Sequence, residues 1–121
     1  MKIYVCHSSS FDFTEELYKP LKESQLERDH EIFYPHDEVG KDINTMDVIK
    51  EADLIISEGS FASTGMGIEL GRAEMLDKNI VFVVKKGIKP STALRFLSDD
   101  FIEYEFGEDL VKQLNEFIEN M

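Results

Sequence analysis

The sequence predicts an α/β fold: a doubly wound, five-stranded parallel sheet between two layers of helices, a three-layer α/β/α sandwich. Short runs of β-branched and aromatic residues alternate with longer segments of helical periodicity. Two of these runs, residues 54–56 (LII) and 80–84 (IVFVV), are apolar without alternation, as strands covered on both faces are. The chain has no repeat, linker or low-complexity segment, so we expect a single domain over residues 1–121.

The expected strands are short and end at turn-forming or polar residues. They cover residues 2–6, 31–34, 53–57, 80–84 and 101–106. The expected helices cover residues 14–27, 42–51, 65–77, 91–97 and 108–119. Asp12 or Thr14 is the expected N-cap of the first helix. Pro20 removes one backbone hydrogen bond from that helix, which predicts a kink or a late start.

Strict alternation of strands and helices indicates parallel strands joined by right-handed crossovers. Five strands favour a flavodoxin-like order, 2-1-3-4-5, in which the first and third strands are neighbours. The winding reverses between those two strands, and ligands of such sheets bind there, beyond the carboxyl ends of the strands. We therefore expect the loops 6–13 and 58–65 to lie side by side and to form the site.

The composition excludes several function classes. With 13 Lys and Arg against 25 Asp and Glu, the net charge of −12 disfavours DNA or RNA as a partner. No apolar run approaches the roughly 20 residues of a membrane span, and we expect neither a membrane partner nor a signal peptide. The single cysteine, Cys6, excludes an internal disulfide and fits a cytoplasmic protein. Three scattered histidines predict no metal site, and we expect no cofactor.

The stretch that points to chemistry runs from Asp53 to Leu76, a strand followed by small residues and a helix start. Gly65 and Gly67 allow close backbone approach beside free N–H groups, which favours an anion. The glycine spacing is not a dinucleotide fingerprint, and no P-loop follows. Ser63 either donates to the same anion or caps the helix. Glu69 either complements the helix dipole, pairs with Arg72 or has a chemical role.

The run S-x-G-x-G-x-E-L-G-x-A, from Ser63 to Ala73, resembles the core motif of the nucleoside 2-deoxyribosyltransferase family, whose relatives include the 2′-deoxynucleoside 5′-phosphate N-hydrolases. IYVC near the start, EAD before the third strand and STAL at residue 91 extend the resemblance. It implies a flavodoxin-like, oligomeric enzyme, a homodimer or larger. Such an enzyme cleaves or transfers the N-glycosidic bond of 2′-deoxynucleosides or their 5′-monophosphates.

The resemblance also implies roles for individual residues. Glu69 matches the nucleophile, which forms a deoxyribosyl-enzyme, and Tyr4 matches a tyrosine that holds this carboxylate and the sugar. Ser63 matches a hydroxyl that binds the 5′-phosphate, and Ser91 or Thr92 falls where a second phosphate contact crosses a subunit interface. The further substrate-binding candidates are Cys6, His7, Ser8, Ser9, Gly65 and Gly67. The position of Cys6 at a strand end favours a small core residue over a nucleophile. A structural role for His7 is an equal alternative, and His36, near the same edge, is a weaker candidate.

The chain departs from the family at the acid that protonates the leaving base. Counted back from Ala52 and Asp53, Thr45 occupies the usual aspartate position. Asp42, one turn earlier on the same expected helical face, is the preferred substitute. Asp47 is the less favoured one, because it lies about 200° round the helix. If neither acts, the alternative is a catalytically weak or inactive nucleotide-binding module of the same fold.

Overall fold

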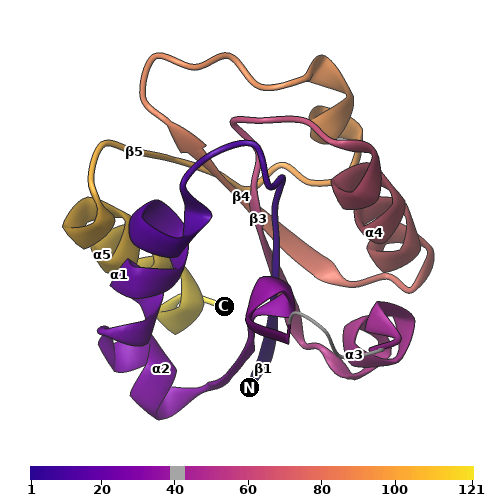
Figure 1. Ribbon diagram of the computed structural model, residues 1–121, viewed down its shortest axis with the longest axis horizontal. Coiled ribbons are helices and arrows are strands. Elements are labelled where there is room, and N and C mark those ends of the chain that lie inside the picture. Colours follow the sequence, from indigo (N-terminus) through magenta and orange to yellow (C-terminus); the bar gives the residue numbers. More distant parts are fainter. Residues whose placement is uncertain (39–42) are drawn as a thin grey trace.

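The computed structural model describes residues 1–38 and 43–121. It confirms a five-stranded parallel sheet in the order β2-β1-β3-β4-β5 (Figure 1). The strands are β1 (Lys2–Cys6), β2 (Glu31–Phe33), β3 (Leu54–Glu58), β4 (Asn79–Lys85) and β5 (Phe101–Tyr104). As expected, β1 and β3 are neighbours, so the loops that leave their carboxyl ends start side by side.

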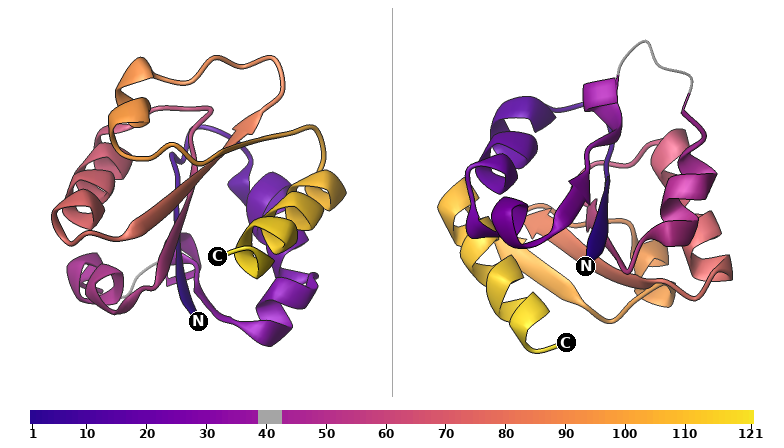
Figure 2. Two further views of the ribbon diagram at one scale, coloured as in Figure 1. Left: turned by 180° about the vertical axis from the view of Figure 1, so that it is seen from behind. Right: turned by 90° about the horizontal axis from the view of Figure 1, so that it is seen from below.

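Helices cover both faces of the sheet and complete the three layers. The longer segments are α3 (Thr45–Glu51), α4 (Thr64–Met75) and α5 (Gly107–Glu119). The shorter ones are the π-helical turn η1 (Thr14–Tyr18), α1 (Lys19–Lys22), α2 (Gln25–Asp29), and the 3₁₀ turns η2 (Pro35–Glu38) and η3 (Thr92–Phe96). In Figures 1 and 2, α1, α2 and α5 cover one face, and α3 and α4 cover the other. None of the helices within the described residues is long and apolar enough to cross a membrane.

The first predicted helix is broken into three pieces, which corrects the single span 14–27. A π-helical turn directly precedes the helical turn that contains Pro20. Proline has no N–H for the carbonyl one turn back, and its ring crowds that carbonyl, so a regular α-helix cannot pass through it. The chain breaks again at Ser24, whose hydroxyl donates to the Leu21 carbonyl at 2.6 Å. Leu17, Leu21 and Leu26, one from each of the three pieces, are nonetheless fully buried.

The second predicted helix starts later than expected. The range 42–51 is wrong at its beginning, because α3 starts at Thr45. The Asn44 side chain is the reason: it accepts a hydrogen bond from the Met46 N–H at 3.0 Å and caps the helix there. Asp42 lies outside the described residues. Thr45 is therefore the first residue of α3.

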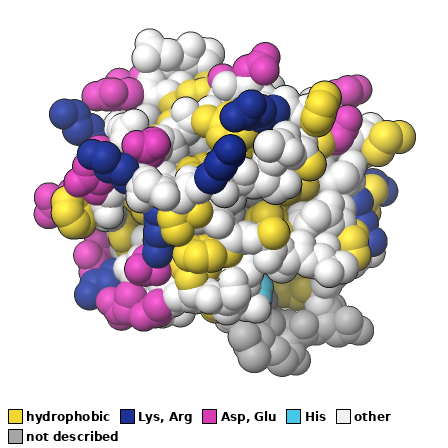
Figure 3. Space-filling view, turned by 90° about the horizontal axis from the view of Figure 1, so that it is seen from above, with side chains coloured by type: hydrophobic (Ala, Val, Ile, Leu, Met, Phe, Trp, Pro, Cys, Tyr) yellow, Lys and Arg dark blue, Asp and Glu magenta, His cyan; other side chains and the backbone are white. Residues whose placement is uncertain are grey.

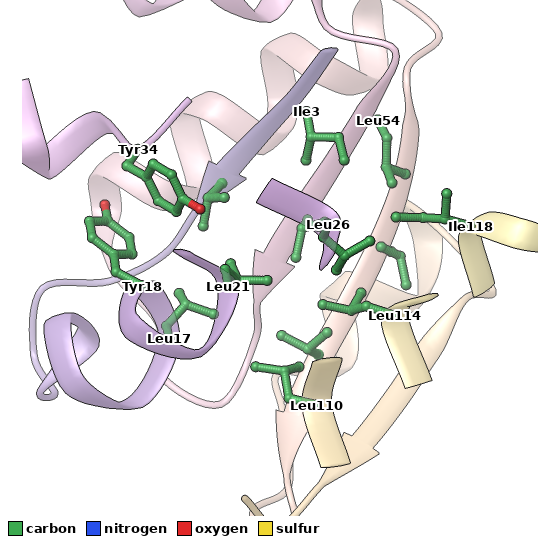
Figure 4. Close-up of a cluster of buried hydrophobic side chains, with 14 of the residues drawn as sticks. Ile3, Leu17, Tyr18, Leu21, Leu26, Tyr34, Leu54, Leu110, Leu114 and Ile118 are labelled. Carbon is green, nitrogen blue, oxygen red and sulfur yellow. The ribbon is translucent and has the colours of Figure 1, made fainter. Parts of the chain in front are cut away.

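Alternate strand residues point to opposite faces, and this divides the core into two clusters. Under α1, α2 and α5 lie Ile3, Val5, Leu54, Ile56, Val81 and Val83, with Leu110, Leu114 and Ile118 of α5 packed against them (Figure 4). On the other face, Tyr4, Cys6, Ile55, Ile80 and Phe82 pack against Ile49, Met66, Leu70 and Ala73 of α3 and α4. This alternation brings Tyr4 to the layer that contains Glu69.

Candidate active site

The candidate site lies at the carboxyl edge of the sheet, which Figure 3 shows from above. The loops after β1 and β3 meet here, and their aromatic side chains connect them: Phe11 stacks on Phe61 with ring centroids 5.1 Å apart. The Lys85 ammonium lies 5.3 Å from each of those two ring centroids. The sequence predicted the meeting of the loops but not this aromatic pair, since no local pattern specifies which phenylalanines stack.

Tyr4, Glu69 and Thr45 come together from three different elements. Tyr4 of β1 has no exposed surface, and its hydroxyl donates a hydrogen bond to Oε2 of Glu69 on α4. The Tyr4 ring is fixed from the other side by Phe33 of β2, a stacked neighbour at 5.7 Å. The Thr45 side chain, at the start of α3, lies beside both groups and interacts with each. A partly buried carboxylate is thus oriented by the Tyr4 hydroxyl, with the Thr45 side chain beside it.

Burial raises the pKa of Glu69 above its ordinary value, because a charged carboxylate loses solvation there. Four neighbours act in the opposite sense and lower this pKa: the Tyr4 hydroxyl first, then His36, Thr45 and Arg72. Burial and the adjacent carboxylate also raise the pKa of Tyr4, so its phenol stays protonated and remains the donor of the pair. The arrangement keeps the Glu69 carboxylate desolvated but oriented, which suits a nucleophile.

The start of α4 is open. Ser63 is its N-cap and accepts from the Met66 N–H at 3.2 Å, so the capping interpretation holds and leaves the hydroxyl proton free. Gly65 and Gly67 are exposed, and an added Cβ at either would meet nothing within 4 Å. The packing of this chain therefore does not require glycine there. Small residues at an open helix N-terminus leave room for a ligand or another chain.

Ser63 and Gly67 also line an apolar groove of about 320 Å³ between α4 and η3. Ser91, the N-cap of η3, lies in the same groove, whereas Glu69 is not among its lining residues. Thr92 is exposed. The structure thus brings Ser91 together with Ser63, not with the carboxylate.

The start of the loop after β1, which was expected to contact a ligand, is largely buried. His7 is 4% exposed, with Nδ1 2.7 Å from the Ser8 carbonyl and Nε2 2.6 Å from the Tyr18 hydroxyl. Burial lowers the pKa of His7, so the ring is neutral; Nδ1 donates to the carbonyl and Nε2 accepts from the phenol. Both ring nitrogens are therefore engaged within the chain. Tyr18 was missed by the sequence reasoning, because only tertiary packing brings it to His7.

Cys6 and Ser8, on either side of His7, are also buried. Cys6 is fully buried, and its Sγ lies 3.8 Å from the Met66 carbonyl oxygen. Burial raises the pKa of this thiol, which keeps it protonated and unreactive. The Ser8 hydroxyl is 2.8 Å from that of Ser10, and only 2% of Ser8 is exposed. Ser9 is exposed and is the one of the three predicted loop contacts after Cys6 that reaches the surface.

The preferred acid for the leaving group, Asp42, lies outside the described residues and stays a prediction. The less favoured Asp47 is exposed in the first turn of α3. His36 follows β2 at the same edge; its ring centroid is 4.8 Å from that of His7 and 4.8 Å from that of Phe13. Within the described ranges, no group of three or more His, Cys, Asp or Glu side chains is placed to hold a metal ion.

Two solved structures share this fold over nearly the whole chain. CMP N-glycosidase from Clostridium botulinum superposes with a TM-score of 0.65 at 23% identity, covering 95% of this chain and 99% of that one. A 2-deoxyribosyltransferase from Bacillus psychrosaccharolyticus superposes with a TM-score of 0.62 at 21% identity, covering 91% and 90%. Both agree with the family resemblance of the Ser63–Ala73 run. No protein-family model matches the chain, and no curated protein matches it significantly.

Proposed function

We propose that this protein is an enzyme that cleaves or transfers the N-glycosidic bond of 2′-deoxynucleosides or their 5′-monophosphates, with Glu69 as nucleophile. The observation that carries the proposal is the buried Tyr4 hydroxyl donating to the Glu69 carboxylate, with Thr45 beside both. The two solved structures with this fold, named as an N-glycosidase and a deoxyribosyltransferase, support the reaction class.

The chemistry follows from that geometry. A desolvated, oriented carboxylate attacks the anomeric carbon through an oxocarbenium-like transition state and forms a glycosyl-enzyme. Tyr4 donates its one hydroxyl proton to the carboxylate and so holds it in place for this attack. Water then releases the sugar in hydrolysis, whereas a second base accepts it in transfer. Neither half-reaction uses a cofactor.

The start of α4 is the proposed phosphate subsite. The Ser63 hydroxyl and the first N–H groups of α4 face an open surface at Gly65 and Gly67, where an anion is favoured by the helix dipole. Lys85 is held by Glu16 at 2.8 Å and is therefore already paired. We assign recognition of a 5′-phosphate to Ser63 and the backbone of this turn.

A homodimer is part of this proposal. The surface formed by α4 and η3 carries large exposed apolar side chains: Ile68 is 52% exposed, Met75 84% and Phe96 88%. The groove that contains Ser91 lies between the same two elements. Burying this face against a second copy would remove these side chains from water. It would also bring Ser91 or Thr92 of each protomer toward the site of the other, as the family resemblance implies.

The decisive experiment measures free-base release from 2′-deoxynucleosides and their 5′-monophosphates, with and without an acceptor base. CMP and dCMP belong in the panel, because one protein of this fold is a CMP N-glycosidase. Glu69→Gln should abolish turnover, while Glu74→Gln, an exposed carboxyl on the same helix, should not. Base release that survives in Glu69→Gln would refute the assignment of the nucleophile.

A nucleotide-binding module without turnover is the second candidate, and the hydroxyl of Thr45 in place of an acid favours it. Under this alternative the whole panel is silent at high enzyme concentration. A nucleoside monophosphate nevertheless binds in calorimetry, and Ser63→Ala weakens that binding. Turnover of any member of the panel by the wild-type protein would exclude the module.

A further inference from the structure

The proposed reaction requires a proton donor that the described residues do not provide at the expected position. A purine or pyrimidine leaves poorly as an anion, so an acid must protonate it as the bond to the sugar breaks. Thr45 occupies the site beside Glu69, and an alcohol is too weak an acid for this task. The donor must therefore be a different side chain that faces Glu69.

Most proton-bearing groups around Glu69 are unsuited to the role. Some of these groups shift the pKa of Glu69, and Glu69 shifts the pKa of others. They are Tyr4, Cys6, Tyr18, Thr45 and Arg72. Burial raises the pKa of both tyrosines and of the cysteine, so these groups hold their protons too tightly near neutral pH. A guanidinium does not release its proton in proteins.

His36 differs from all of them in its position. It lies in η2, just beyond β2 at the carboxyl edge, and is exposed, so a ligand can reach its ring. Its backbone N–H donates to the Tyr18 hydroxyl at 3.2 Å, and its ring packs 4.8 Å from both His7 and Phe13, which fixes the imidazole. Within the described residues, neither ring nitrogen of His36 has a hydrogen-bond partner. Imidazole is the side chain that most readily exchanges protons near neutral pH.

We propose that His36 is the general acid of this enzyme and takes the part that an aspartate has in the family; the inference rests on the proposed function. As Glu69 forms a bond to the anomeric carbon, the electron pair of the carbon–nitrogen bond passes to the base. One ring N–H of the His36 imidazolium gives its proton to that base, which leaves neutral. Water then attacks the anomeric carbon, Glu69 leaves as carboxylate, and the proton of the water restores the imidazolium.

The charged and titratable groups around His36 are consistent with this cycle. Glu69 faces it from α4, and His36 lowers the pKa of that carboxyl, as a cation does. Neutral His7 faces it from the loop after β1, and the Tyr18 hydroxyl faces it from η1. The neighbouring Asp37 is already paired with Lys22 of α1.

The test compares two substrates that differ only in the need for an acid: 2′-deoxyguanosine 5′-monophosphate and its N7-methylated form. The methylated base carries a fixed positive charge and leaves as a neutral molecule without accepting a proton. We expect His36→Gln to lower kcat/KM for the unmethylated substrate by about 10²–10⁴-fold, and to leave the methylated substrate nearly unaffected.

The controls separate the possible failures. His30→Gln alters a histidine at the opposite edge of the sheet, 3.1 Å from the terminal amino group, and should behave as wild type on both substrates. Equal losses on the two substrates in His36→Gln would overturn the inference. So would a loss selective for the unmethylated substrate in Asp42→Asn but not in His36→Gln. If the wild-type protein cleaves only the methylated substrate, the assignment of His36 as general acid is overturned, but that of Glu69 as nucleophile is not. If it cleaves neither substrate, the proposed function is overturned as well.

Discussion

Tyr4→Phe removes a single oxygen atom from the centre of the candidate site. The phenylalanine ring keeps the stacking on Phe33, so packing in the core is preserved. What is lost is the hydrogen bond to Oε2 of Glu69. A hydrogen bond to a charged group contributes about 1.5–3 kcal/mol, which corresponds to roughly 10–150-fold in the population of the ionised carboxylate.

The direction in which Tyr4→Phe shifts the pH dependence follows from the effect of the Tyr4 hydroxyl on the pKa of Glu69. The Tyr4 hydroxyl lowers the pKa of Glu69, so its removal lets burial raise that pKa further. If Glu69 is the nucleophile, as proposed, it must be ionised, and activity should be lost as the pH falls through the pKa of Glu69. In Tyr4→Phe the acid limb of the pH profile of kcat therefore moves to higher pH. The loss of activity is largest at low pH and smallest well above the shifted limb.

The assay is base release across pH 4 to 9, with thermal unfolding measured on the same samples. Tyr104→Phe is the matched control, because Tyr104 donates to Glu58 in the same way but that carboxylate is fully buried elsewhere. The control should lower the melting temperature without moving the pH profile. An acid limb in Tyr4→Phe that coincides with that of the wild type would refute the idea that this hydroxyl controls the ionisation of Glu69.

Three further changes have defined outcomes. Glu69→Gln should raise the melting temperature at pH 7: burial raises the pKa of this carboxyl above 4.5, so the stability of the wild type increases as the pH falls through that raised pKa, and the variant should lack the increase. Cys6 should resist iodoacetamide in the native protein and react only after unfolding, as mass spectrometry would show. Gly107→Ala should cost about 1–3 kcal/mol, since a Cβ there would come within 2.5 Å of Pro20, whereas Gly71→Ala, which meets nothing within 4 Å, should gain up to about 1 kcal/mol in a monomer. A Gly71→Ala variant that instead dissociates a dimer in ultracentrifugation would place the subunit interface on α4.

The arrangement of the sheet could be predicted because it follows from patterns that are local. The run 80–84 is apolar on both faces, and strict alternation with helices leaves few topologies for such strands. The pairing of Tyr4 with Glu69 was not predicted from such patterns; only the family resemblance implied it, and the structure brings the two side chains into contact.

The features that could not be predicted depend on contacts between distant segments. His7 was expected to face a ligand, but Tyr18, a residue of the following helix, occupies its Nε2. Nothing in the run HSSS marks this, because the hydrogen bond exists only once η1 has packed on the sheet. The start of α3 was misjudged for a different reason: Asn44 and Asp42 are both good N-caps, and the sequence alone does not decide between them.

Thr45 shows how one substitution redistributes the chemistry of such a site. An aspartate at this position would face Glu69 with a second negative charge, and like charges raise the pKa of a carboxyl. The threonine hydroxyl lowers the pKa of Glu69 instead, so the proposed nucleophile is more readily ionised. The same change removes the nearest acid. With Glu69 as the proposed nucleophile and a threonine beside it, the proton for the leaving base must come from another side chain, and His36, just beyond β2 at the same edge of the sheet, is the proposed donor.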